Sequence, residues 1–286
     1  MGSKNTKTTS KSLDTGAKTG VIILPNKKLK KFPTQLCSSS KSPTQFVKVR
    51  SLDLSGNLLT NINVDLSHFK ALKTINLSGN RLTQLTSIYQ LPSLQNLDIS
   101  NNKLIALPRL PLKIQKINAS KNQIAVVDCI LKLSKLKELN LSNNSIVGIA
   151  SSFFQECNLD KLERLDLSHN NLDCIAISIR SLSKLNYLNI SNNNLVSLPI
   201  ELGQCKSLQT VLAANNRLDT IPSELLDNGS LSKMRLENNR IEKEDFLEIT
   251  GAEEFMERRK ARIDREIHGG MHATDRSVCG LDGNRK

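Results

Sequence analysis

One spacing of apolar residues and asparagines repeats along most of the chain. The pattern is L-x-x-L-x-L-x-x-N-x-L, in which Ile, Val, Ala or Met can replace Leu, and its first copy starts at Val49. Nine asparagines occupy the same place in successive copies: Asn57, Asn80, Asn102, Asn122, Asn144, Asn170, Asn193, Asn216 and Asn239. Neighbouring asparagines are 20 to 26 residues apart, which indicates a repeat protein with one structural unit per copy.

The L-x-L core of each copy predicts a short strand. Side chains alternate between the two faces of a strand, so both leucines point to one side and the residue between them points to the other. Successive copies then place their strands side by side in one parallel sheet. Because a single copy cannot bury its apolar edge alone, we expect a cap at each end of the stack.

Both ends of the array differ from its middle. The segment TGVIILPNKKLKKFP is an incomplete copy with Lys27 in place of the Asn, and apolar residues at helical spacing in 246–263 predict a helical cap split at Gly251. The predicted organisation is a flexible basic segment 1–19, a solenoid 20–241 with one degenerate and nine regular repeats, a helical cap 242–268 and a disordered tail 269–286.

These copies resemble the leucine-rich repeat superfamily. The segments MGSKNT, KTGVIIL with LKKFP, and EEFMERRKA are similar to the arrangement in the family of leucine-rich-repeat-containing protein 57. The resemblance implies an α/β fold, a curved horseshoe solenoid with a parallel sheet on its concave face, an N-terminal degenerate repeat cap and a C-terminal helical cap. It also implies that the nine asparagines form a structural ladder of buried amides, and that the protein is intracellular and non-enzymatic with an N-terminal lipid anchor.

Charge and cysteine content narrow the possible partners. The net charge is +13, but residues 1–31 hold eight lysines and one acid, and the remaining excess is dilute across 32–241. With two tyrosines, seven phenylalanines and no tryptophan, the chain also has few residues for stacking on bases, which argues against nucleic acid as a partner. The six cysteines lack disulfide or zinc spacing, and we expect them to be reduced thiols.

The N-terminus carries the sharpest functional motif. Met1, Gly2 and Thr6 fit M-G-x-x-x-[ST], which predicts attachment of myristate to Gly2. Because one myristoyl chain binds membranes only marginally, a second signal is needed. This second signal would be the electrostatic attraction of an anionic leaflet for Lys4, Lys7, Lys11 and Lys18. Since the chain shows no spanning segment and no secretory signal, we expect a cytoplasmic, peripheral membrane protein; the alternative is a flexible, solubilising tail.

Residues that point outward from the predicted strands form columns along the sheet. Two columns hardly vary, whereas the column two residues before the middle of each L-x-L changes chemistry from copy to copy. Tyr187 beside Arg164 and Glu138 offers the aromatic and arginine anchors that dominate many protein interfaces. The candidate partner-binding residues on the concave face are Lys116, Glu138, Arg164, Tyr187, Leu212, Lys233 and Arg235.

No enzyme motif accompanies the repeats. The sequence lacks a phosphate-binding G-x-x-x-x-G-K-[ST], a G-x-S-x-G and an H-E-x-x-H, so we expect no catalytic residue, metal, cofactor or small-molecule substrate. We expect a non-enzymatic scaffold or adaptor that binds a protein partner at a membrane. The alternative is a soluble regulatory subunit of a signalling enzyme, in a phosphatase or small GTPase pathway, for which the N-terminus is irrelevant.

Overall fold

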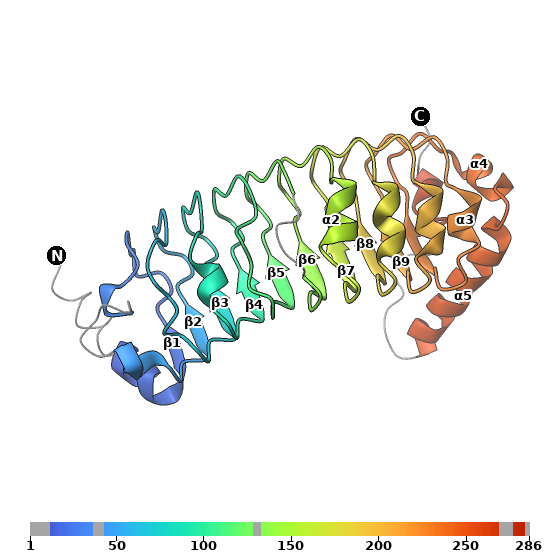
Figure 1. Cartoon of the computed structure of the whole chain (residues 1–286). Helices are drawn as coiled ribbons and strands as arrows, with labels where there is room; N and C mark the ends of the chain where they lie inside the picture. Colours follow the sequence, from blue (N-terminus) through green and yellow to red (C-terminus); the bar gives the residue numbers. More distant parts are fainter. Residues whose placement is uncertain (1–11, 37–42, 128–132, 269–276, 284–286) are drawn as a thin grey trace.

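The computed structural model describes residues 12–36, 43–127, 133–268 and 277–283. Within them, ten short parallel strands stack in chain order into one open sheet (Figure 1). The strands are β1 Val21–Ile23, β2 Ser51–Asp53, β3 Thr74–Asn76, β4 Asn96–Asp98, β5 Lys116–Asn118, β6 Glu138–Asn140, β7 Arg164–Asp166, β8 Tyr187–Asn189, β9 Thr210–Leu212 and β10 Lys233–Arg235. The N- and C-terminal strands therefore form the two edges of the sheet.

The register of the sheet follows the repeat. Equivalent positions pair directly, as Leu52 pairs with Ile75 and Leu165 with Leu188. The middle residue of each strand is buried and its two neighbours face outward, as the alternation of side chains requires. The buried leucines and isoleucines of all repeats join in one continuous core, so each repeat is stabilised by its neighbours.

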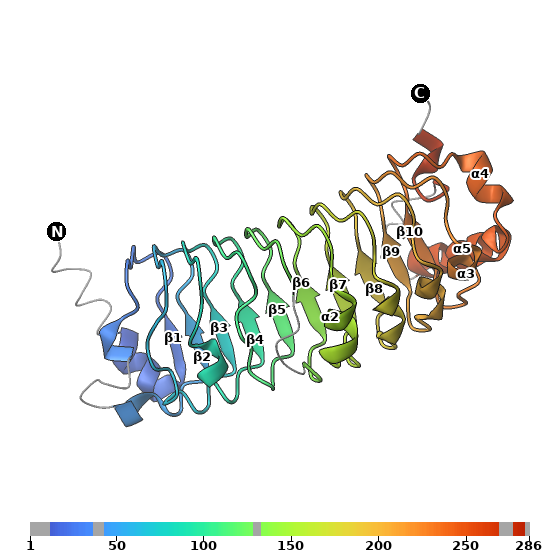
Figure 2. The same ribbon diagram turned by 45° about the horizontal axis from the view of Figure 1, so that its top comes forward.

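The side of the stack opposite the strands holds short helical segments (Figure 2). They are η1 Thr34–Leu36, η2 Pro43–Phe46, η3 Ile88–Gln90, α2 Ser151–Glu156, η4 Ile177–Ser181, η5 Ile200–Gln204 and α3 Ser223–Leu226. The longest repeat, between Asn144 and Asn170, accommodates α2, which packs through the edge-to-face rings of Phe153 and Phe154 at 5.6 Å. The extra residues of this repeat are thus accommodated on the side opposite the strands.

The helical cap lies at the C-terminal end of the stack. It consists of α4 Lys243–Glu248 and α5 Ala252–His268, and Gly251 separates them with φ of 85°. Glycine adopts this left-handed conformation without steric cost, which explains the break between the helices. The edge-to-face rings of Phe246 and Phe255 pack the two helices together.

Two terminal segments differ from the sequence-based prediction. Residues 12–19 of the expected flexible segment are helical, and Leu13 is buried. Residues 277–283 of the expected disordered tail return to the last repeat and end in η6 Leu281–Gly283, with Cys279 and Leu281 buried. The backbone N–H of Leu236 donates to the carbonyl of Cys279 at 2.8 Å. This segment therefore covers part of the β10 edge, where unpaired backbone groups would otherwise remain.

The expectation of six reduced thiols is also wrong for one residue. Cys157 is disulfide-bonded, whereas Cys174, Cys205 and Cys279 are reduced thiols. The spacing of the cysteines along the chain carried no sign of this bond. Burial raises the pKa of the Cys205 thiol to about 11, so this thiol stays protonated at neutral pH. Cys37 and Cys129 lie outside the described residues.

Candidate functional site

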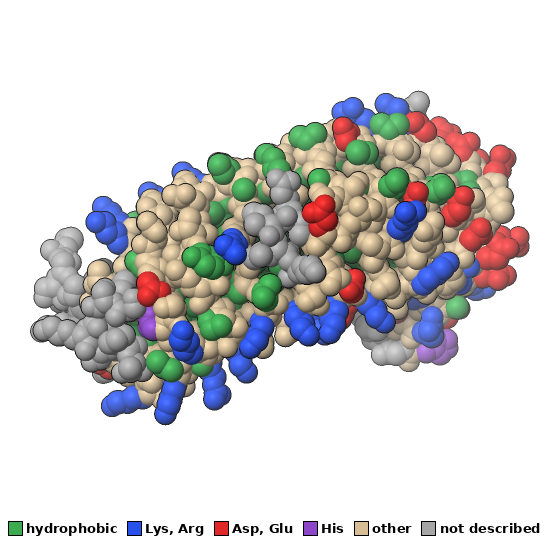
Figure 3. Space-filling view, viewed as in Figure 1, with side chains coloured by type: hydrophobic (Ala, Val, Ile, Leu, Met, Phe, Trp, Pro, Cys, Tyr) green, Lys and Arg blue, Asp and Glu red, His purple; other side chains and the backbone are tan. Residues whose placement is uncertain are grey.

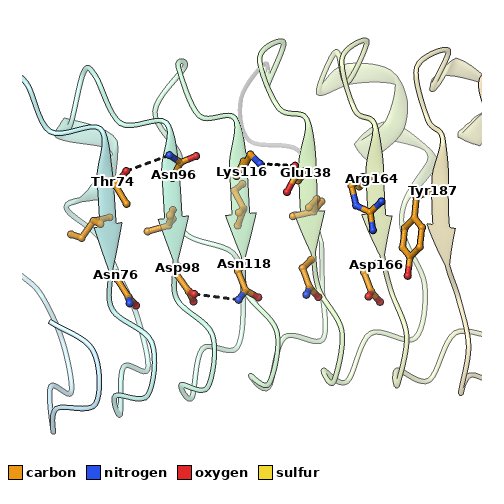
Figure 4. A pocket seen from close by; sticks show the side chains of 15 residues that line it. Thr74, Asn76, Asn96, Asp98, Lys116, Asn118, Glu138, Arg164, Asp166 and Tyr187 are labelled. Carbon is orange, nitrogen blue, oxygen red and sulfur yellow. Dashed lines mark hydrogen bonds and ion pairs between the residues drawn. The ribbon is translucent and has the colours of Figure 1, made fainter. Parts of the chain in front are cut away.

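The outward-facing side chains of β2–β10 form a continuous surface, which we call the strand face. Its central part is a shallow depression of about 520 Å³, lined by residues from β3 to β8 (Figure 4). Each strand contributes its first residue to one column and its third residue to a second column. The two columns differ in whether their polar groups are hydrogen-bonded within the protein or exposed.

The third-residue column is hydrogen-bonded within the protein. Asp98 Oδ1 accepts from the backbone N–H and the hydroxyl of Ser100, at 2.9 and 2.6 Å, and Asp166 Oδ1 does the same with Ser168. Between neighbouring strands, Asn118 Nδ2 donates to Asp98 Oδ2 at 3.3 Å. These contacts give the recurring Asp/Asn-x-Ser a structural role, since the side chain closes the turn that follows each strand.

The first-residue column is more exposed and chemically varied. Lys116 Nζ lies 2.7 Å from Glu138 Oε1, and the two side chains are 52% and 39% exposed. An exposed ion pair of this kind contributes about 0–1 kcal/mol to stability. Its two charged groups can therefore reorient toward a partner at little cost to the fold.

Arg164 and Tyr187 form the aromatic part of this column. The guanidinium carbon of Arg164 lies 3.9 Å from the centre of the Tyr187 ring, within the range of a cation–π contact. Burial raises the pKa of the Tyr187 phenol, and nearby Asp166 raises it further, while Arg164 and a hydrogen bond with Asn189 act in the opposite direction. At neutral pH the phenol is protonated and can donate a hydrogen bond to a partner.

Comparison with known proteins identifies the architecture. Residues 47–104 and 134–195 match the family model described as leucine rich repeat. The fold is a leucine-rich-repeat solenoid. The parallel-sheet solenoid predicted from the repeats is therefore confirmed.

Several solved structures share this leucine-rich-repeat architecture. A leucine-rich-repeat protein of Leptospira interrogans is 28% identical with a TM-score of 0.70, covering 82% of this chain and 58% of that one. An internalin from Listeria monocytogenes is 16% identical with a TM-score of 0.61, and the match covers 80% of this chain and 64% of the internalin chain. A chain of the Toll–Spätzle complex of Drosophila is 19% identical with a TM-score of 0.62, and the match covers 78% of this chain and 33% of that one. No curated protein matches the sequence. The chain thus spans less than two thirds of the length of each of these structures.

The candidate residues divide into two groups on the solenoid. Lys116, Glu138, Arg164 and Tyr187 line the depression. The other three lie beyond it, on β9 and β10: Leu212, Lys233 and Arg235. Arg235 is held by Glu237, whose Oε1 accepts from its Nε at 2.9 Å and lies 2.7 Å from its terminal nitrogen. The depression also includes Thr74 and Asn96, which share the first-residue register and are not among the predicted partner-binding residues.

The nine repeat asparagines form one hydrogen-bonded ladder. In each, Oδ1 accepts a backbone N–H of the preceding repeat and Nδ2 donates to carbonyls of both repeats; Asn80, for example, accepts from Leu59 at 3.1 Å and donates to Leu54 at 3.0 Å and to Leu77 at 2.9 Å. The same contacts occur at Asn57, Asn102, Asn122, Asn144, Asn170, Asn193, Asn216 and Asn239. These amides stabilise the solenoid and are not available to a partner.

The residues of the predicted lipid anchor lie mostly outside the described structure. Gly2, Lys4, Lys7 and Lys11 fall in residues 1–11, whereas Lys18 is exposed on the helical segment 12–19. None of the described helices has the length and hydropathy of a membrane-spanning segment. Within the part of the chain that the structure describes, His, Cys, Asp and Glu side chains do not gather in groups of three that could hold a metal ion.

Proposed function

We propose that this leucine-rich-repeat solenoid is a non-enzymatic scaffold or adaptor whose strand face binds a protein partner. The observation that carries the proposal is the contrast between the two columns. Both line the depression of about 520 Å³, but the third-residue column is occupied by hydrogen bonds within the protein, whereas the first-residue column presents charged and aromatic groups that are more exposed.

Tyr187 and Arg164 are the expected centre of the contact. Tyrosine and arginine are enriched among residues that dominate interface energetics, because they combine a large contact area with directional hydrogen bonds. Here the ring and the guanidinium already contact each other, so little side-chain freedom is lost on binding. The Toll–Spätzle complex, a protein complex with the same kind of solenoid, supports this class of function.

Replacing Tyr187 by Ala is expected to abolish capture of the partner while leaving the fold intact. A tagged chain would be recovered from cells, and its bound proteins would be quantified by mass spectrometry. Thr210→Ala is the matched control, because Thr210 occupies the same column on the next strand but does not line the depression. Loss of a central tyrosine typically weakens an interface by about 2 kcal/mol, or roughly 30-fold. Equal capture by wild type, control and Tyr187→Ala would exclude this part of the strand face.

We further propose that the protein is a cytoplasmic, peripheral membrane protein, anchored by myristate on Gly2 with help from Lys4, Lys7, Lys11 and Lys18. The motif at Met1–Thr6 supports acylation, and the lysines supply the second signal that a single myristoyl chain needs. The similarity of the terminal segments to the family of leucine-rich-repeat-containing protein 57 supports the same location.

The Gly2→Ala variant is expected to move from the membrane fraction to the soluble fraction of eukaryotic cells. The measurement is intact mass of the purified chain together with fractionation, and Ser3→Ala serves as the control because it leaves the acceptor glycine in place. An unacylated N-terminus with unchanged fractionation would contradict the anchor. If the partner complex also survived deletion of residues 1–11, a soluble regulatory subunit of a signalling enzyme would become the better description.

A further inference from the structure

Lysines and arginines line the edge of the solenoid at which the strands begin. We call this surface the basic edge and define it by nine exposed residues: Lys48, Arg50, Lys70, Lys73, Lys113, Lys135, Lys161, Lys184 and Lys206. In Figure 3 a row of Lys and Arg side chains follows the lower margin of the molecule. In the sequence these residues are dispersed over more than 150 positions, and only the stacking of the repeats brings them together.

Backbone hydrogen bonds fix the spacing of this row. The residue just before each strand bonds to its equivalent in the preceding repeat, as Lys73 N–H donates to Arg50 O at 2.8 Å and Gln95 N–H donates to Lys73 O at 2.9 Å. Farther along the same edge, the Ser207 hydroxyl donates to Ser183 O at 2.8 Å. Since neighbouring strands in a sheet are about 4.8 Å apart, charges from successive repeats lie within a Debye length of one another.

The positive charge of the basic edge is largely uncompensated. Among the described residues, none of its nine basic side chains forms an ion pair. The acids at this edge include Asp65, Asp160 and Glu163, and Glu163 lies 3.5 Å from Lys137, which is outside the set of nine. At the C-terminal end Arg262 of α5 lies at the same edge, where its Nε donates to Ser232 O at 3.0 Å, and its charge is paired with Glu266.

The opposite edge, where the strands end, carries less positive charge. In the regular repeats its exposed basic residues are Arg81, Lys103, Lys121, Arg217 and Arg240, and the degenerate repeat adds Lys28, Lys30 and Lys31 at the N-terminal end. Asp219 lies 3.5 Å from Arg240 and compensates part of this charge. Along the regular repeats, the edge at which the strands begin therefore carries more positive charge than the opposite edge.

We propose that the basic edge binds an anionic phospholipid surface, so that the solenoid stands on the membrane along this edge. The nine residues form a row on an exposed ridge, which a planar array of headgroups can contact along its whole length. Leu112, beside Lys113, is 63% exposed and places an apolar side chain at the same edge. Single-stranded nucleic acid is less well suited, because the edge positions hold no aromatic side chain on which bases could stack.

This surface acts independently of the N-terminal anchor and determines how the bound solenoid is oriented. The strand face begins where the basic edge ends, so contact along the edge leaves the depression around Arg164 and Tyr187 open to a partner. Myristate on Gly2 would then confine the chain to the bilayer, and the edge would set which surfaces remain accessible. The proposal can therefore be tested on a chain that carries no lipid.

The test uses the full, unacylated chain made in bacteria and sedimented with vesicles of about 30% phosphatidylserine in phosphatidylcholine, a composition that provides an anionic surface. We expect binding that requires phosphatidylserine and declines when salt is raised from about 0.1 to about 0.5 M, because screening shortens the range of the attraction. The edge variant is Lys113→Glu, Lys135→Glu, Lys161→Glu and Lys184→Glu combined. It should bind at least about tenfold more weakly, since four contacts with the leaflet are reversed.

The matched control reverses four charges on the opposite edge: Arg81→Glu, Lys103→Glu, Lys121→Glu and Arg217→Glu. Both variants have the same net charge and keep the N-terminal lysines, and circular dichroism verifies that both are folded. The control should bind within about threefold of wild type, because its substitutions lie away from the leaflet. Equal loss in both variants would show a response to net charge alone and overturn the proposal. No binding by the wild type, or preference for a single-stranded RNA oligomer over the vesicles, would overturn it as well.

Discussion

Replacing Asn170 by Ala lowers the free energy of unfolding by about 3–5 kcal/mol, because several buried backbone groups lose their partners together. The Asn170 amide donates to Leu141 O at 3.0 Å, to Leu167 O at 2.9 Å and to Ser168 O at 3.2 Å, and its oxygen accepts the Ile146 N–H at 3.0 Å. Alanine can replace none of these contacts. Asn170 is also only 8% exposed, so water has little access to the groups left unpaired.

The neighbouring asparagine provides the control for this experiment. Asn171 is exposed, and replacing its side chain by Ala should change stability by no more than about 0.5 kcal/mol. Urea unfolding of wild type and both variants, followed by circular dichroism, measures the difference. Hydrogen exchange at Ile146 should also accelerate in Asn170→Ala alone. If Asn170→Ala and Asn171→Ala had the same free energy of unfolding, the ladder would contribute nothing to stability at this repeat.

Gly203→Ala is expected to be the most disruptive of the small substitutions between the helical segments. A Cβ built on Gly203 would lie 2.2 Å from the carbonyl oxygen of Glu224 and 2.6 Å from its carbonyl carbon. Because these are backbone atoms, the clash can be relieved only if η5 and α3 move apart. Forcing extra volume into a packed interior costs about 1–3 kcal/mol or more.

Gly148 serves as the matched control for Gly203. A Cβ added to Gly148 would have no neighbour within 4 Å, and its φ is not positive. Gly148→Ala should therefore leave stability unchanged or raise it by up to about 1 kcal/mol, because alanine restricts the unfolded chain. Thermal unfolding of the two variants distinguishes these outcomes. If the Gly203→Ala and Gly148→Ala variants unfolded at the same temperature, η5 would not pack closely against α3 at Gly203.

The strands could be predicted from the sequence because they follow from the repeat itself, and the resemblance to leucine-rich repeats implied the asparagine ladder. The alternation around Leu52 or Leu165 identifies the buried face of a strand, and each Asn recurs at the point where its strand has ended. The break between α4 and α5 was also predictable, because Gly251 interrupts a helical spacing of apolar residues. These features depend on positions close together along the chain.

The register of the predicted strands placed Tyr187 beside Arg164, but the specific contacts between repeats could not be predicted in the same way. The pairing of Lys116 with Glu138, the stacking of Arg164 on Tyr187 and the depression that they share depend on which side chains lie opposite one another in neighbouring strands. The unequal repeat lengths, from 20 to 26 residues, are absorbed on the helical side and leave the strand register unchanged. The strand face is therefore continuous even where the sequence period is irregular.

The sequence alone determined the repeat, its inward-facing apolar residues and the helical C-terminal cap, because each is encoded within a single repeat or segment. The tertiary structure decided the disulfide bond of Cys157, the return of residues 277–283 to the last repeat and the row of charges from Lys48 to Lys206. Basic residues that looked dispersed along the chain form a row on one edge. The physical reason is that stacking converts a separation of about 22 residues into the distance of about 4.8 Å between adjacent strands.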